Sequence, residues 1–598
     1  MKKRNTAILA TFLTISMIAP FSVNAQAEDT SKSEFASLLE SKYKDPDRVY
    51  SSDVRWWLGS ASATDETLLE EIQTLYDSGF RGVELCMQSD GVAPDEDYAY
   101  GSEMWSHKWK LMMNKLLDLG MGVYLTSGTN WASSNVPVSE LDPTSSAAMQ
   151  IIASSYEPIY CESGQKLEAT PLGVPGAYSV PWGETEGEVV SCVRDNTKLR
   201  FVYAYELTDD GKINADADII DLMAEGKIEK GEGETNYTVN WEVPGEGKKY
   251  MIYPIYSQGS YETSEPATEP CYTTNYFSKD GIEALKKFWT EHYLSDPELN
   301  EKIKNGDVQL FMDSLEIKYG NEKEGITWWT EDAVEEFQKR KGYDIRPYFV
   351  LIQEVGNGFN LATNMHSQCV GKYDLTDTDL RKKIIQDWQD VMTQLYEENM
   401  LVPLKEWLNS YGIKTRAQIS YGKALEITEP SQYVDYPEAE NLNQYNQPDI
   451  LRLHTAGAKL LNKVLSTETG GTSAVYGTSW QELLDDIYVQ YAVGFQRVIW
   501  HIWTADYGYG NYNWPGYMSG FGGGTAFNRW GSREPASRDY DEFNAHIGRV
   551  QEFLQEGKSR TDVGFVYNSW TQGMKSGGED GSFTENSMNW KLAHQGVI

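Results

Sequence analysis

The sequence has few cysteines and no long apolar run beyond its first 25 residues. Cysteine occurs five times in 598 residues, which excludes a small scaffold held together by disulfide bonds. Without a later run of about 20 apolar residues, insertion into a membrane is not expected. Neither Gly-x-Ser-x-Gly nor His-Glu-x-x-His occurs. The sequence therefore lacks the nucleophile motif of serine hydrolases and the zinc-binding helix motif of metalloproteases.

Basic residues are also scarce compared with acidic ones. The chain has 52 Lys and Arg residues against 89 Asp and Glu residues, for a net charge of -37. Nucleic acids and anionic membrane surfaces attract positively charged proteins, so this balance argues against both as partners. The acidity is spread along the chain and indicates a well-solvated surface.

Residues 1–27 have the features of a signal peptide. A basic start at Lys2–Arg4 precedes an apolar stretch from Ala7 to Val23, and Val23-Asn24-Ala25 supplies small residues for cleavage. This order predicts a cleavable signal peptide and a secreted or cell-surface bacterial protein.

Aromatic residues are abundant, with 19 Trp and 38 Tyr. Their flat faces stack on sugar rings, and their N–H and O–H groups bond hydroxyls. Aromatic residues also fill protein cores. Composition alone therefore leaves carbohydrate binding and core packing open.

Short apolar runs alternate with amphipathic stretches along much of the chain. This alternation predicts a parallel sheet with helices between its strands. Eight such strands make a (β/α)8 TIM-like barrel the natural fold class. The expected strands are 54–58, 82–87, 122–126, 308–312, 413–419, 433–436, 463–466 and 497–501.

The alternation is interrupted between residues 142 and 260. Short alternating runs and Gly/Pro turns there, with strands expected at 200–205 and 249–253, predict an inserted antiparallel β-sandwich domain. Barrel segments at 28–141 (strands 1–3) and 261–558 (strands 4–8) flank it. Residues 559–598 are expected to start a C-terminal α/β domain that the chain truncates.

Acidic residues follow or lie in several predicted strands. Active sites of such barrels lie at the C-terminal ends of the strands. Asp313 and Glu316 close the fourth strand, Glu438 and Glu440 follow the sixth, and Glu468 closes the seventh. Glycosidic cleavage needs one protonated and one ionised carboxyl group, so these acids are the candidate catalytic residues. Glu316 as a helix cap, Glu438 and Glu440 as a solvated turn, and Asp313 as a backbone partner remain alternatives.

The barrel segments together resemble glycoside hydrolase family 106, the α-L-rhamnosidases. The strongest match is Asp313-Ser-Leu-Glu316, followed by Trp328, Phe337 and the segment 340–344. Order and spacing make the resemblance fairly specific, and it covers roughly residues 55–530. The other matching pieces are 54–58, 82–85, 128–131, 416–418, 421–422, 435–440, 466–468, His501 and 515–516.

The resemblance implies removal of terminal α-L-rhamnose with inversion, and a calcium ion whose ligands we do not assign. It implies that Glu316 is the general acid, that Glu468 or the pair Glu438 and Glu440 supplies the base, and that Asp313 supports the acid. The segment 130–134 departs from the family's glycine-rich pattern, so the sequence does not determine which terminal sugar the enzyme removes. A barrel glycosidase for another terminal sugar and an inactive carbohydrate-binding protein are the alternatives. The expected substrate-binding residues are Trp56, Trp57, Glu84, Asn130, Trp131, Arg416, Gln418, Tyr421, His501 and Trp503.

Overall fold

The computed structural model divides the chain into two units, Met1–Asp47 and Arg48–Ile598. In the first unit it describes helix α2 (Glu34–Lys44). The predicted signal peptide and the predicted domain at 559–598 lie outside the described residues. No described helix is long and apolar enough to cross a membrane. The described residues are 34–59, 63–88, 100–129, 134–154, 158–175, 196–264, 269–313, 315, 317, 326–355, 370–371, 373–419, 425–441, 448–470, 479–504, 530–532 and 534–557.

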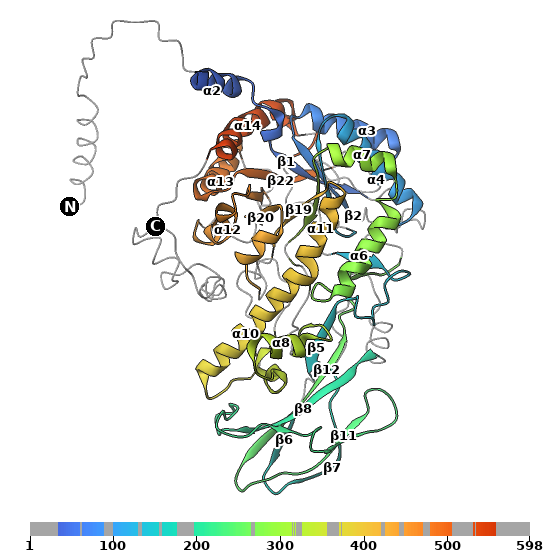
Figure 1. Ribbon diagram of the computed structural model, residues 1–598, viewed down its shortest axis with the longest axis vertical. Helices are drawn as coiled ribbons and strands as arrows, with labels where there is room; N and C mark the ends of the chain where they lie inside the picture. Colours follow the sequence, from blue (N-terminus) through green and yellow to red (C-terminus); the bar gives the residue numbers. More distant parts are fainter. Residues whose placement is uncertain are drawn as a thin grey trace, which may run out of the picture. The chain divides into compact units, whose positions relative to one another are not determined.

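The second unit is built on a closed barrel of eight parallel strands (Figure 1). This confirms the (β/α)8 fold expected from the alternation of strands and helices. Strands three and four of the barrel are neighbours although 181 residues, 127–307, separate them in the chain. The strands are β1 (Asp53–Gly59), β2 (Gly82–Gln88), β3 (Gly122–Thr126), β15 (Val308–Met312), β19 (Lys414–Ala417), β20 (Tyr436–Glu440), β21 (Ser466–Thr469) and β22 (Arg497–Thr504).

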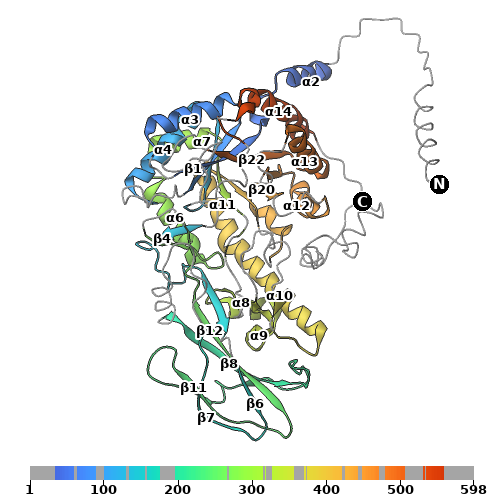
Figure 2. The ribbon, with the colours of Figure 1, turned by 180° about the vertical axis from the view of Figure 1, so that it is seen from behind.

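Helices surround this barrel in both views (Figures 1 and 2). Local signals fix several of their starts: Thr64 caps the first barrel helix, and Ser479 forms a reciprocal capping box with Glu482. The described helices of this unit are α3 (Asp65–Asp77), α4 (Glu103–Asp118), α6 (Lys279–His292), α7 (Pro297–Asn305), α8 (Ala333–Lys341), α9 (Phe349–Ile352), α10 (Thr378–Tyr396), α11 (Val402–Ser410), α12 (Pro448–Leu460), α13 (Trp480–Val493) and α14 (Tyr540–Glu556). Of these, α8 and α9 lie away from the barrel, beside α10 (Figures 1 and 2).

Alternate residues of each barrel strand face opposite sides, as the geometry of a strand requires. In β1, Val54, Trp56 and Leu58 belong to the large apolar core beneath the helices. Their neighbours Asp53 and Arg55 make ion pairs across the interior of the barrel. We call this interior the lumen. Its polar filling differs from the branched apolar residues that usually occupy such barrels.

A large antiparallel sheet follows the first three barrel strands. It has the order β18-β17-β16-β5-β12-β8-β9, with β6 paired to β12. A three-stranded sheet, β10-β11-β7, shares a separate apolar core with it, in which Trp241 packs edge-on against Tyr250 at 5.5 Å. The strands are β5 (Gln150–Ser154), β6 (Ile159–Glu162), β7 (Lys166–Pro171), β8 (Lys198–Leu207), β9 (Ile220–Asp221), β10 (Ile228–Lys230), β11 (Tyr237–Glu242), β12 (Lys249–Gly259), β16 (Ile326–Trp329), β17 (Glu354–Val355) and β18 (Val370–Gly371).

This sheet combines strands of the predicted insert with three strands that follow it in the chain. Strand β16 pairs with β5, and β17 and β18 extend the sheet beyond it. All three come from the segment that the sequence assigned to the barrel. A third small sheet, made of β13 (Thr263–Ser264), β14 (Cys271–Thr273) and β4 (Asn135–Pro137), joins the two ends of the insertion.

Two barrel strands lie further along the chain than predicted. The sixth was expected at 433–436, but a 3-10 turn ends at Tyr433 and β20 begins at Tyr436. The seventh was expected at 463–466, but Lys463 binds the backbone carbonyls of Ser431 and Gln432, and β21 begins at Ser466. As a correction, Glu438 and Glu440 therefore lie within a strand, not in a turn after it.

Candidate active site

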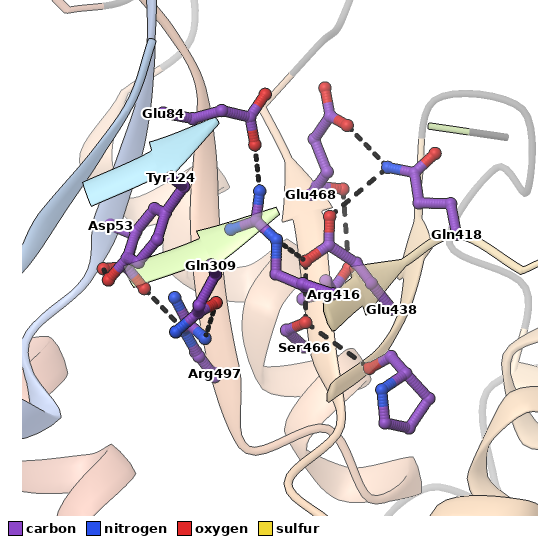
Figure 3. A network of polar contacts seen from close by, with 12 residues as sticks. Asp53, Glu84, Tyr124, Gln309, Arg416, Gln418, Glu438, Ser466, Glu468 and Arg497 are labelled. Atoms are coloured by element: carbon purple, nitrogen blue, oxygen red, sulfur yellow. Dashed lines mark hydrogen bonds and ion pairs between the residues drawn. The ribbon is translucent and has the colours of Figure 1, made fainter. Parts of the chain in front are cut away.

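Polar side chains fill the lumen from its N-terminal end upward. At the deep end, Arg497 binds Asp53 at 2.6 Å and donates to Gln309 at 3.0 Å. The hydroxyl of Tyr124 donates to the other oxygen of Asp53 at 2.6 Å (Figure 3). Asp53 and Arg497 are the first residues of β1 and β22. This group therefore lies at the N-terminal end of the lumen, far from the C-terminal ends of the strands.

A second group lies around Arg416, whose side chain is fully buried. Arg416 forms ion pairs with Glu84 and, at 3.2 Å, with Glu438 (Figure 3). Ser466 donates its hydroxyl to Glu438 at 2.6 Å. Glu438 thus has partners from two neighbouring strands and is 1 % exposed, which makes it a poor candidate for contact with a substrate.

A third group gathers around Glu468, toward the C-terminal ends of the strands. Its Oε2 atom lies 2.8 Å from Nη2 of Arg55 and accepts a hydrogen bond from Gln418 at 2.6 Å. Its Oε1 atom lies 3.7 Å from Nε2 of His501. Asp313, directly after β15, pairs with the same Arg55 nitrogen at 3.1 Å. Strands β1, β15, β19, β21 and β22 therefore deliver polar groups to one point.

Glu440 lies beside Glu468 on the neighbouring strand, since the two occupy paired positions in the register of β20 and β21. It is 5 % exposed. Its charge is one of the influences that raise the pKa of Glu468. Of the two alternative bases, Glu440 is therefore the one that adjoins Glu468 at the level of Arg55.

Burial and the neighbouring charges raise the affinity of the Glu468 carboxyl group for a proton. Burial raises the pKa of Glu468 well above its usual value, the charge of Arg55 opposes the rise, and Asp313 and Glu440 add to it. Burial, with the charge of Arg55, lowers the pKa of His501 well below its usual value. His501 is therefore neutral at working pH and adds no second cation beside Glu468.

The structure brings together most of the described site residues predicted from the sequence. Glu468, Asp313, Glu440, Gln418 and His501 meet at the level of Arg55. Glu84, Arg416 and Glu438 lie directly beneath them. The predicted residues Glu316, Asn130, Trp131 and Tyr421 lie outside the described residues.

Two tryptophans predicted to contact sugar face away from the lumen. Trp56 is fully buried in the core beneath the helices, and Trp503 donates its N–H to Glu71 of α3 at 2.9 Å. Neither can stack on a sugar in the barrel, so the prediction was wrong at both positions. Trp57, one residue along, faces the lumen and meets His501 edge-on at 5.1 Å.

The residue that sequence reasoning missed is Arg55. It lies in the apolar run Val54-Arg-Trp-Trp-Leu58, where one charged residue among apolar ones is easily taken for an edge position. Strand alternation was the available signal, because Arg55 shares a face with Asp53. Two charged residues on the same face of a strand in a closed barrel indicate a polar lumen.

The calcium ion that the family resemblance implies stays a prediction. Among the described residues, no cluster of three or more His, Cys, Asp or Glu side chains is arranged to hold a metal. Glu84, Asp313 and Glu468 all pair with the guanidinium of Arg55.

Comparisons with known proteins identify a solved structure with a similar fold. No family model and no curated protein matches the chain. The rhamnosidase from Novosphingobium sp. PP1Y is similar with a TM-score of 0.56 at 13% identity, covering 87% of this chain and 61% of that one. The polyextremophilic β-galactosidase from the Antarctic haloarchaeon Halorubrum lacusprofundi has a TM-score of 0.41 at 10% identity, covering 91% and 64%. The β-galactosidase from the psychrophilic Marinomonas ef1 has a TM-score of 0.37 at 9% identity, covering 84% and 61%. The chain thus spans less than two thirds of each of these proteins.

Proposed function

We propose that this protein is a secreted bacterial glycoside hydrolase that removes terminal α-L-rhamnose with inversion of configuration. The observation that carries the proposal is Glu468, a buried carboxyl group held by Arg55 and Gln418 where five barrel strands deliver polar groups. The fold shared with a rhamnosidase supports the same class of reaction. Because fold alone does not determine chemistry, the proposal depends on this carboxyl group.

Glu468 is proposed to act as the general base. Two donors fix its Oε2 atom, so Oε1 is the oxygen that takes the proton from a water molecule. The water oxygen then attacks the anomeric carbon from the face opposite the leaving group. A raised pKa makes Glu468 a stronger base, provided that it is ionised at the working pH.

Glu316 is proposed as the general acid that gives its proton to the leaving oxygen, as the family resemblance implies. Asp313 precedes it by three residues and lies against Arg55 at 3.1 Å. The guanidinium of Arg55 therefore binds both Glu468, the proposed base, and Asp313, the proposed support for the acid. Calcium remains an expectation of the resemblance alone.

The test is a panel of p-nitrophenyl glycosides assayed with the wild type, Glu468→Gln and Glu316→Gln. We expect hydrolysis of the α-L-rhamnoside and a loss of about 10²–10⁴-fold in kcat for Glu468→Gln. Glu316→Gln should lose less on this activated leaving group than on an alkyl rhamnoside, whose leaving oxygen needs the proton. Glu301→Gln, at a 70% exposed side chain on α7, is the matched control.

Product stereochemistry provides the second readout. Proton NMR during the first minutes should show the β-anomer of rhamnose before mutarotation. The α-anomer first would contradict inversion. Hydrolysis of a different sugar would keep the mechanism and change the specificity, and sugar binding without turnover would favour a carbohydrate-binding protein.

A further inference from the structure

One guanidinium group at the level of Glu468 serves three carboxyl groups at once. Nε of Arg55 lies 2.6 Å from Glu84, while its Nη2 atom lies 3.1 Å from Asp313 and 2.8 Å from Glu468. The three acids come from β2, β15 and β21. Arg55 is 3% exposed, so water screens none of these interactions effectively.

Neighbouring groups hold this guanidinium in a single orientation. Its carbon lies 4.9 Å from the centroid of the Phe311 ring, and the same ring lies 4.5 Å from the guanidinium of Arg416. Glu84 binds both arginines. Arg55 is therefore clamped by an aromatic face and by a carboxylate that is itself anchored below.

We propose that Arg55 is a positioning residue that orients the carboxyl group of Glu468 and keeps it ionised, a role that rests on the proposed function of Glu468 as the base. The ion pair joins Nη2 of Arg55 to the Oε2 atom of Glu468. The other oxygen is thereby turned toward the side of the lumen where His501 lies. This contact also places the positive charge of Arg55 2.8 Å from Glu468.

A lysine at this position would keep the charge but not the geometry. The contacts use two nitrogens of the guanidinium, one for Glu84 and one shared by Asp313 and Glu468. An ammonium group is a single point and cannot reproduce this planar fork. Charge and orientation can thus be separated by comparing Arg55→Lys with Arg55→Met.

The pH dependence follows from the groups that face Glu468. Arg55 lowers its pKa, against burial and against the neighbouring acids, which raise it. Removing Arg55 takes away the main influence that lowers the pKa of Glu468, so Glu468 should stay protonated to a higher pH. The charged and titratable groups around it are Arg55 on β1, Glu84 on β2, Asp313 after β15, Arg416 on β19, Glu438 and Glu440 on β20, and His501 on β22.

The experiment compares the pH profile of kcat/KM for the wild type, Arg55→Lys and Arg55→Met on the glycoside that the wild type hydrolyses. We expect Arg55→Met to lose about 100-fold or more in kcat and to shift the acid limb to higher pH. Arg55→Lys should recover the position of the acid limb but only part of kcat. Added guanidinium chloride, but not sodium chloride, should raise the rate of Arg55→Ala.

Arg497→Lys is the matched control, because Arg497 is equally buried in the lumen but pairs with Asp53 at its deep end. It should lower the melting temperature and leave the pH profile unchanged. If the Arg55 variants that fold show the wild-type pH profile, or if guanidinium gives no rescue, the inference is overturned while the proposed function stands. A wild type that hydrolyses no glycoside overturns both.

Discussion

Gln418 donates its side-chain N–H to Oε2 of Glu468 at 2.6 Å. Gln418 lies directly after β19 and Glu468 lies on β21, so this bond passes over the intervening strand β20. An amide N–H can only donate, and it therefore favours the ionised form of its carboxyl partner. Gln418 and Arg55 together leave Glu468 with one restrained oxygen and one turned toward His501.

Gln418→Leu should lower kcat by about tenfold to a hundredfold, with little change in KM. A hydrogen bond to a charged group contributes about 1.5–3 kcal/mol, and its loss leaves the base less well oriented and more easily protonated. Steady-state kinetics on the hydrolysed glycoside measure this. A variant whose KM rises while kcat is unchanged would show that Gln418 binds substrate instead of orienting Glu468.

Activity should fall on the acid side through a pKa above the usual glutamate value of about 4.3. Burial raises the pKa of Glu468, and a base works only when ionised, so protonation as the pH falls removes activity. Asp313→Asn removes a negative neighbour that contributes to the rise. Its acid limb should therefore lie at lower pH than that of the wild type, as pH profiles of kcat/KM would show.

An acid limb that stays in place in Asp313→Asn would contradict this electrostatic coupling. Asp307→Asn is a suitable control. Asp307 pairs with Arg81 at 2.7 Å near the deep end of the lumen. It should leave the profile unchanged.

The barrel could be predicted because its outward-facing residues follow the usual rules. Val54, Trp56 and Leu58 recur at every second position and pack in the apolar core, and Thr64 caps the first helix of the barrel. The sixth strand was misplaced since Tyr436-Pro-Glu-Ala-Glu440 contains a proline and two acids. Such a composition is rare in strands, and only a polar lumen makes it suitable.

The candidate site could be predicted residue by residue but not as a network. Acids near strand ends identified Asp313 and Glu468, because all parallel strands end on one side of the barrel. The arginine at their centre could not be predicted from spacing. Its partners Glu84, Asp313 and Glu468 are up to 413 residues away in the chain. The outward direction of Trp503 likewise depends on contact with Glu71 of a distant helix.

The two adjacent tryptophans of β1 should respond differently to truncation. Trp56→Ala opens a cavity in the core beneath the helices and should lower the free energy of unfolding by about 3–5 kcal/mol. KM of the folded enzyme should not change. Trp57→Ala, in the lumen beside His501, should weaken sugar binding by about 0.5–1.5 kcal/mol, a few-fold in KM. Denaturant titrations and steady-state kinetics on both variants separate the effects, and a raised KM in Trp56→Ala would contradict the assignment of its side chain to the core.

The ion pair between Arg497 and Asp53 should affect stability without affecting chemistry. Both side chains are fully buried and lie 2.6 Å apart. Arg497→Met leaves the carboxylate of Asp53 in the lumen without its cation and should cost about 3–5 kcal/mol. Arg497→Met combined with Asp53→Leu should recover much of that loss, because an apolar pair leaves no buried charge.

The exposed pair Lys302–Asp118, at 39% and 62% exposure, is the control for that cycle. Lys302→Met should cost less than about 1 kcal/mol, because water screens the interaction. Arg497→Met and Lys302→Met could lose equal free energy of unfolding, or the double variant could be no more stable than Arg497→Met. Either result would show that the ion pair between Arg497 and Asp53 does not stabilise the barrel. The difference matters for the site above it, since Arg55 lies two residues beyond Asp53 on the same strand and faces the same lumen. A barrel anchored at its deep end can hold Arg55 and Glu468 in register while substrate and water exchange at its mouth.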